Sequence, residues 1–149
     1  MQISPGGSGL RFEELAIGMS AQSMRMVSDA DVIAFADVSG DYNPVHLDRE
    51  YAARSPFKER IAHGMLTAAY ISALIGTRLP GPGSIYVSQS LRFRRPVRLG
   101  AQVETSVTIA ALDPERARVT LDCVSSVDGR TVLEGEAVII APRLGAGAG

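Results

Sequence analysis

The stretch that most limits the possible folds of this chain is residues 62–76, which read AHGMLTAAYISALIG and contain no Asp, Glu, Lys or Arg. A helix that is apolar on nearly every face must be buried on most of its sides. This segment is also too short to cross a bilayer. We therefore expect a central helix with a sheet curled around it.

The chain that follows this segment has the residue alternation of strands. A turn rich in Pro and Gly at residues 79–83 separates the two parts, and apolar and polar residues then alternate. Asp128 and Gly129 form a dipeptide that is typical of a tight hairpin. The predicted strands are residues 84–94, 103–111, 116–127 and 131–140.

The part of the chain before the central helix predicts an edge strand and short helices. Residues 20–27 alternate weakly, as in an edge strand. Ser28 is placed to cap a helix, with Asp31 as its capping-box partner, and Gly40 is placed to end that helix. A short helical turn is expected at residues 48–53. Helices thus come first and an antiparallel meander second, which predicts an α+β fold.

Composition favours one folded domain. The chain has 149 residues, of which 46% are hydrophobic and 21% charged, so it can form a core and is not expected to be disordered. A net charge of −1 argues against a nucleic-acid-binding protein. One cysteine excludes an intramolecular disulfide, and no Cys/His spacing suggests a metal site.

The ends of the chain are rich in glycine. We expect flexible tails at residues 1–9 and 143–149, and one domain at residues 10–142. The N-terminus lacks the basic and apolar regions of a signal peptide, and no apolar run is long enough for a membrane span. A cytoplasmic protein without membrane partners is therefore expected.

The turn between residues 39 and 46 reads SGDYNPVH and places an acid and a base close together. Pro44 stiffens the segment between Asp41 and His46, which could then share one water molecule. Histidine has a pKa suited to moving protons. The alternative is that Asp41 only ends the preceding helix and His46 is a loop residue, because Asp and Asn favour turns in any case. The turn alone leaves both interpretations open.

A second candidate is Gly64, where the central helix begins. The first amides of a helix lack partners and carry the positive end of its dipole, and a glycine lets a substrate carbonyl approach them. The alternative is that Gly64 only permits close packing, and the sequence does not decide between the two. For His63 we favour a structural role at the start of the helix, with its ring hydrogen bonds satisfied.

These segments together resemble the MaoC-like hydratases, which include the (R)-specific enoyl-CoA hydratases. The resemblance rests first on FADVSGDYNPVHLD at residues 35–48 and IAHGML at residues 61–66. It continues through weaker matches and covers about residues 15–141. The weaker matches are residues 79–86, 89–93, 96–97, 100 and 135–137.

The resemblance implies a hot-dog fold, in which a long antiparallel sheet wraps around one central helix. It also implies homodimers or larger oligomers whose sheets join edge to edge, with CoA thioesters entering through a tunnel. It places a catalytic dyad at Asp41 and His46 and a carbonyl-binding amide at Gly64. It places Asn43 in the signature turn, and Ser72 and Ile75 beside the acyl chain.

The implied reaction is the reversible addition of water to trans-2-enoyl-CoA, giving (R)-3-hydroxyacyl-CoA. Asp41 would act as the base, while His46 would orient the water and relay the proton. No metal or redox cofactor is expected, because no electrons leave the substrate. Arg92, Arg94 and Arg95 form a basic cluster that we interpret mainly as a solvated strand face and, more weakly, as a contact for CoA phosphates.

Three other functions are compatible with such a fold. A thioesterase would not need the paired His46. A dehydratase of acyl-carrier-protein substrates, or of branched or dicarboxylic CoA thioesters, would use the same dyad. A non-catalytic acyl-CoA-binding module of the hot-dog type is the alternative of another class, and it would be expected to have lost the dyad.

Overall fold

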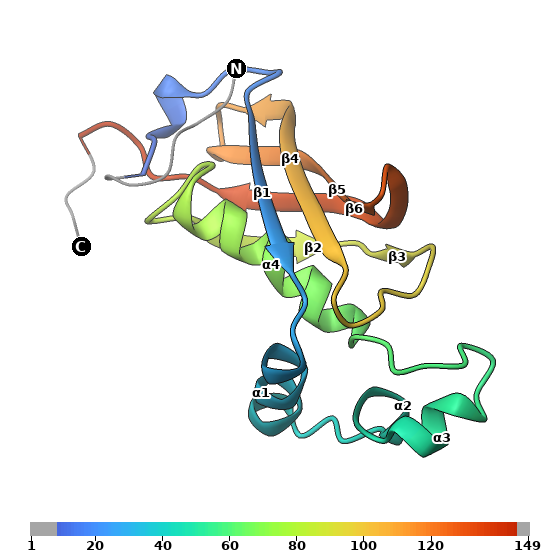
Figure 1. The fold of residues 1–149 in the computed structure, drawn as a ribbon. Coiled ribbons are helices and arrows are strands. Elements are labelled where there is room, and N and C mark those ends of the chain that lie inside the picture. Colours follow the sequence, from blue (N-terminus) through green and yellow to red (C-terminus); the bar gives the residue numbers. More distant parts are fainter. Residues whose placement is uncertain (1–8, 146–149) are drawn as a thin grey trace.

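The computed structural model describes residues 9–145 as one antiparallel sheet and a set of helices (Figure 1). The sheet has six strands in the order β1-β4-β5-β6-β2, and β3 also pairs with β6. The strands are β1 Ser20–Met26, β2 Ile85–Gln89, β3 Arg92–Phe93, β4 Gln102–Asp113, β5 Arg118–Val127 and β6 Arg130–Ile140. The helices are a 3₁₀ turn at Phe12–Glu14, then α1 Asp29–Ser39, α2 Pro44–Leu47, α3 Arg49–Ala53 and α4 Gly64–Thr77. This arrangement confirms the predicted α+β class and hot-dog fold.

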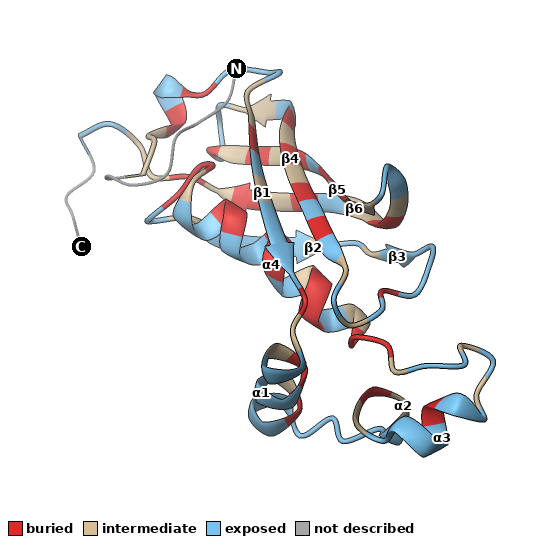
Figure 2. Ribbon diagram, viewed as in Figure 1, coloured by how far each residue is buried: buried red, intermediate tan, exposed pale blue. Residues whose placement is uncertain are grey.

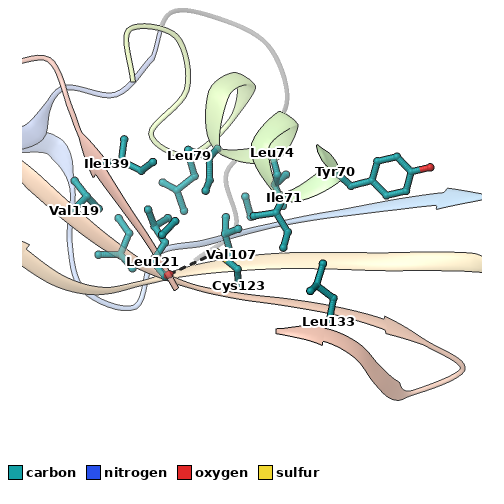
Figure 3. Packing of buried hydrophobic residues seen from close by; sticks show 14 of the residues in the cluster. Tyr70, Ile71, Leu74, Leu79, Val107, Val119, Leu121, Cys123, Leu133 and Ile139 are labelled. Atoms are coloured by element: carbon teal, nitrogen blue, oxygen red, sulfur yellow. Dashed lines mark hydrogen bonds between the residues drawn. The ribbon is translucent and has the colours of Figure 1, made fainter. Parts of the chain in front are cut away.

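Helix α4 packs one face against the sheet and forms the core with it. Ile71 and Leu74 lie among side chains of the sheet, including Val107 and Leu121 (Figure 3). Residues of β4 alternate between buried and exposed positions over most of the strand, as expected for a strand with one face on the core. The buried residues of α4 are Leu66, Thr67, Tyr70, Ile71, Leu74 and Ile75.

The opposite face of α4 is open to solvent, which corrects the expectation that this helix is buried on most sides. Figure 2 shows buried and exposed positions alternating along the helix. The sheet of one chain covers only one side of α4. The uncharged residues on the other side of the helix therefore stay exposed within the described part of this chain. The exposed residues of this open face are Met65, Ala69, Ser72, Ala73 and Gly76.

The strand predicted at residues 84–94 is divided into β2 and β3, and β2 pairs with β6 rather than with β4. The backbone at Ser90 turns toward β6, where its amide donates to Glu136 O at 2.9 Å. The glycine at position 135 makes this approach possible, because a Cβ there would lie 1.8 Å from Ser90 O. The predicted meander is therefore confirmed for β4, β5 and β6, with the hairpin at Asp128 and Gly129.

Helices α1, α2 and α3 lie beyond one end of the sheet (Figure 1). The start of α1 is a capping box, in which Ser28 Oγ accepts from the Asp31 amide and Asp31 Oδ2 accepts from the Ser28 amide. Gly40 ends this helix with a φ of 79°. The local prediction for this helix is therefore confirmed at both ends.

Most of the predicted tails lies outside the described residues, so their flexibility stays a prediction. Near the C-terminal end of the described part, Arg143 donates to Glu115 O at 3.0 Å and the Leu144 amide donates to Glu13 Oε2 at 2.8 Å.

Within residues 9–145, no helix is long and apolar enough to cross a membrane.

The core makes a direct prediction about stability. Ile71→Ala should lower the free energy of unfolding by about 2–5 kcal/mol, because it leaves a cavity at a fully buried position of α4. Val38→Ala is the control, because Val38 on α1 is 83% exposed and its truncation should cost under about 0.5 kcal/mol. Urea denaturation of both variants measures the difference, and equal losses would contradict the assigned core.

Candidate active site

A chain of local hydrogen bonds shapes the turn that carries Asp41. Ser39 Oγ accepts from the Asp41 amide at 3.1 Å, and Asp41 Oδ1 accepts from the Asn43 amide at 3.2 Å. Asn43 Oδ1 then accepts from the Val45 amide at 3.2 Å and caps α2, with Pro44 in its first turn. These residue types favour turns and helix starts, and their succession sets Asp41 one short loop before α2.

His46 lies on α2 and is buried. Its Nδ1 is 2.8 Å from Ile61 O, and because a carbonyl only accepts hydrogen bonds, the proton sits on Nδ1. The neutral ring therefore keeps a free lone pair on Nε2. The Ile61 amide in turn donates to Val45 O at 3.4 Å. Helix α2 and the segment before α4 are therefore joined by hydrogen bonds in both directions.

His63 is almost wholly buried and contacts both members of the predicted dyad. Its Nε2 is 2.9 Å from Asp41 O, and its ring centroid is 3.9 Å from that of His46. Phe35 of α1 packs on the same ring at 4.9 Å. The expectation of a fully satisfied ring is wrong, because Nδ1 of His63 is buried without a hydrogen-bond partner in the described structure.

The spacing of Asp41 and His46 suits one shared water molecule. A carboxylate oxygen of Asp41 and a ring nitrogen of His46 lie within 4.8 Å of each other. Two partners of one water, each at about 2.8 Å and at a near-tetrahedral angle, are about 4.6 Å apart. The turn therefore brings a carboxylate oxygen of Asp41 and a ring nitrogen of His46 close enough to contact one water, and their catalytic role stays a prediction.

The same residues also form a donor set for a metal ion, which spacing in the sequence did not reveal. One ligand atom each from Asp41, His46 and His63 lies within 4.8 Å of the others. The two imidazole rings lie 3.9 Å apart between centroids, at an interplanar angle of 31°. Each ring donates one N–H to a backbone carbonyl, which leaves its second nitrogen for another partner.

The dyad opens onto a cavity of about 490 Å³, within the size range of small-molecule sites. Asp41, His46, His63 and Gly64 line one part of it. The rest of the wall is largely apolar, which suits a ligand with a hydrocarbon chain. The apolar wall residues are Phe57, Ile61, Ala62, Met65, Phe93, Pro96, Val97 and Val132.

Gly64 lies where α4 begins and lines the cavity. This position is compatible both with binding of a substrate carbonyl and with a role in close packing. His63 occupies the N-cap position but makes no side-chain capping bond to the first turn. A Cβ at Gly64 would lie 2.6 Å from the ring of Phe93, so the glycine does permit close packing. The same lack of a side chain keeps the start of the helix accessible from the cavity.

Burial dominates the electrostatics of His46. Desolvation lowers the pKa of its imidazole below the ordinary value of 6.5. The hydrogen bond to the Ile61 carbonyl raises the pKa, but its effect is smaller. His63 lowers the pKa further and Asp41 raises it. Arg60 Nε donates to the backbone carbonyl of His46 at 2.7 Å, and the guanidinium group of Arg60 also pairs with Asp29 of α1. The neutral form of His46 is therefore favoured near neutral pH.

The other predicted binding residues lie outside the group that lines this cavity. Asn43 is an exposed capping residue, Ser72 is on the open face of α4, and Ile75 is wholly buried in the core. Their contact with a substrate stays a prediction. Of the basic cluster, Arg94 and Arg95 line the cavity, where Arg94 pairs with Glu134 and Arg95 donates to Thr131 O.

Residues 14–130 match the model of the MaoC like domain family. The chain is 51% identical to a 3-hydroxybutyryl-CoA dehydratase of Methylorubrum extorquens, over 90% of this chain and 85% of that protein. It is 48% identical to an (R)-specific enoyl-CoA hydratase of Rhodospirillum rubrum, over 90% of this chain and 93% of that protein.

The fold is similar to a solved structure with comparable identity. The unliganded R-hydratase PhaJ1 from Pseudomonas aeruginosa superimposes with a TM-score of 0.86 at 46% identity. The match covers 91% of this chain and 87% of that one. The likeness thus includes nearly the whole described domain.

The burial of His46 predicts its titration. The imidazole should titrate with a midpoint below 6.5, because the folded protein disfavours its charged form. Below pH 6.5 the unfolded chain then binds more protons than the folded one, so the free energy of unfolding should fall as the pH falls. NMR of the Cε1 protons measures the midpoint, and His46→Ala identifies the signal, because the chain has two histidines. A midpoint at or above 6.5 would contradict the assigned environment.

Proposed function

The chain belongs to the MaoC-like domain family, and from this premise we propose that it is a hydratase of trans-2-enoyl-CoA. Water adds reversibly to the double bond and gives (R)-3-hydroxyacyl-CoA. The names of the relatives at 51% and 48% identity support this reaction class. The observation that carries the proposal is the spacing of Asp41 and His46, which fits one water at the wall of an apolar cavity.

We assign binding of the thioester carbonyl oxygen to the backbone amide at the start of α4. An enoyl thioester becomes electrophilic at C3 when its carbonyl is polarised, and the Gly64 amide at the positive end of the helix dipole supplies that polarisation. The same amide stabilises the enolate that develops as C3 is attacked. A donor of this kind is worth about 3–4 kcal/mol in the transition state.

We assign binding and activation of the attacking water to Asp41 and His46. Asp41 accepts one proton from the water as the water oxygen bonds to C3, and the free Nε2 of His46 orients the water and relays that same proton to C2, so that both side chains return to their starting protonation. One O–H bond and the C2–C3 π bond break, and one C3–O and one C2–H bond form. The sum is the addition of water, with no net transfer of electrons, so the scheme needs no redox cofactor.

The alternatives differ in how they use the same residues. If the protein were a thioesterase, the buried His46 beside Asp41 would have no role in the reaction. A non-catalytic binding module has no need for an acid and a base at the distance of one water. A dehydratase of acyl-carrier-protein, branched or dicarboxylic thioesters would use the same dyad, and it is the second candidate. A cytoplasmic location stays a prediction.

Replacing either dyad residue should remove activity and leave the fold intact. Asp41→Asn and His46→Gln should each lower kcat on crotonyl-CoA by about 10²–10⁴-fold, because each removes a proton acceptor and keeps a side chain of similar shape. The assay follows the loss of enoyl absorbance, and chiral chromatography of the product tests the (R) assignment.

Val38→Ala, on the exposed side of α1, is the matched control and should keep the full rate. Wild-type protein that hydrates no short- or medium-chain enoyl-CoA would refute the proposed reaction. A fully active Asp41→Asn or His46→Gln variant would refute the assigned dyad.

We also propose that the protein forms a homodimer through β2 and the open face of α4. Strand β2 is an edge of the sheet, and an unpaired edge is a template for a further strand. Its apolar side chains are uncovered, with exposed fractions of 60% for Ile85, 40% for Tyr86 and 42% for Val87. A second copy would cover both this edge and the charge-free open face of α4.

The dimer makes a prediction about mass. Light scattering should give twice the chain mass of 15.8 kDa, and a double variant of Ile85→Lys and Val87→Lys should shift the protein toward a monomer. Met24→Lys is the control, because Met24 is 62% exposed on β1 at the opposite edge of the sheet. A wild-type monomer, or dissociation by the Met24 variant alone, would contradict the assigned interface.

A further inference from the structure

His63 touches both members of the dyad, and it does so through different parts of its ring. The Nε2 atom is 2.9 Å from Asp41 O, and the ring centroid is 3.9 Å from that of His46. The residue is only 2% exposed, and it belongs to neither the assigned dyad nor the assigned carbonyl site.

The hydrogen bond acts on the main chain of Asp41. Since a carbonyl only accepts, Nε2 of His63 carries the proton and donates it to Asp41 O. Asp41 itself is exposed, and its amide is held by Ser39 Oγ. The bond from His63 therefore ties the exposed loop to the buried start of α4 and restricts where the Asp41 carboxylate can lie.

The ring face acts on His46. With Nδ1 of His46 bonded to Ile61 O, the stacked ring of His63 limits tilting of the imidazole about that bond. It also excludes water from one face of His46, and desolvation is the largest cause of the lowered pKa of this residue. Phe35 of α1 also packs on the His63 ring, with the two ring centroids 4.9 Å apart.

We propose that His63 is a positioning residue that aligns the dyad: its Nε2–H holds Asp41 and its ring face holds His46. This inference rests on the proposed hydratase function. His63 does not itself transfer protons in this scheme. Its Nδ1 is buried and has no hydrogen-bond partner among the described residues.

The charged and titratable groups around His46 come from several elements. Asp41 precedes α2, Arg60 donates to the His46 carbonyl from the loop before α4, and Arg94 and Arg95 line the cavity from the segment after β3. Asp29 of α1 pairs with Arg60. These groups are the same in every His63 variant, and the charge effect of His63, which also lowers the pKa of His46, is lost in all of them. The difference between the His46 titrations of His63→Gln and His63→Phe therefore reports the loss of the stacked ring.

Two substitutions separate the two contacts. His63→Phe keeps an aromatic face against His46 and removes the donor to Asp41 O. His63→Gln removes the ring and keeps an amide donor of similar reach. His63→Ala removes both contacts. Ser125→Ala is the matched control, because Ser125 is a fully buried polar residue that contacts Thr105 within the sheet, outside the cavity.

The kinetic readout separates positioning from a loss of substrate binding. His63→Phe should lower kcat on crotonyl-CoA by about 10- to 100-fold with KM changed less than about threefold, because the dyad is misplaced and the cavity wall is kept. His63→Gln should lose less kcat, because a donor to Asp41 O remains. His63→Ala should lose the most, and Ser125→Ala should keep the wild-type kcat.

The spectroscopic readout does not need activity. In every His63 variant His46 is the one imidazole left in the chain, so its Cε1 proton is assigned without ambiguity. Its titration midpoint should rise toward 6.5 in His63→Gln, because water reaches the ring and the charge effect of His63 is lost, and it should rise less in His63→Phe, where only the charge effect is lost. The acid limb of kcat/KM should move in the same way.

Wild-type kcat in His63→Phe would overturn the assigned bond to Asp41, and equal His46 titration midpoints in His63→Gln and His63→Phe would overturn the assigned stacking. A pure stability effect, shown by equal losses of kcat in Ser125→Ala, would overturn both. If the wild-type protein proves inactive on enoyl thioesters, the proposed function fails. The titration of His46 then still decides whether His63 positions its ring.

Discussion

The site depends on a reciprocal attachment between residues 41–46 and residues 61–63. His63 donates to the carbonyl of Asp41, and His46 donates to the carbonyl of Ile61. Each segment thus satisfies a backbone acceptor of the other with a buried ring, and buried acceptors without partners are costly. Without this attachment, the loop that carries Asp41 would be held mainly by hydrogen bonds to its own neighbours.

This attachment also determines where the cavity lies. His63 occupies the N-cap position of α4, so the proposed dyad lies beside the positive end of the central helix. The sheet fixes that helix through Ile71, Leu74 and the other residues of its buried face. The packed core therefore positions the loop that carries Asp41, through the start of α4 and His63.

Much of the local structure could be predicted from short patterns. The capping box at Ser28, the end of α1 at Gly40 and the hairpin at Asp128 follow from hydrogen bonds and backbone angles within a few residues. The pairing of Asp41 with His46 was accessible for the same reason, because one turn joins them. The division of residues 84–94 was missed, since it depends on the close approach of Ser90 to Gly135 in a distant strand.

The sequence by itself determined the central apolar helix, the strand order of the last hairpins and the turn that holds an acid and a base. These features rest on periodicity and on contacts between near neighbours in the chain. Only the tertiary structure decided that His63 stacks on His46, that one face of α4 stays uncovered and that β2 lies beside β6. The reason is that such contacts join segments whose approach is set by the packing of the whole core.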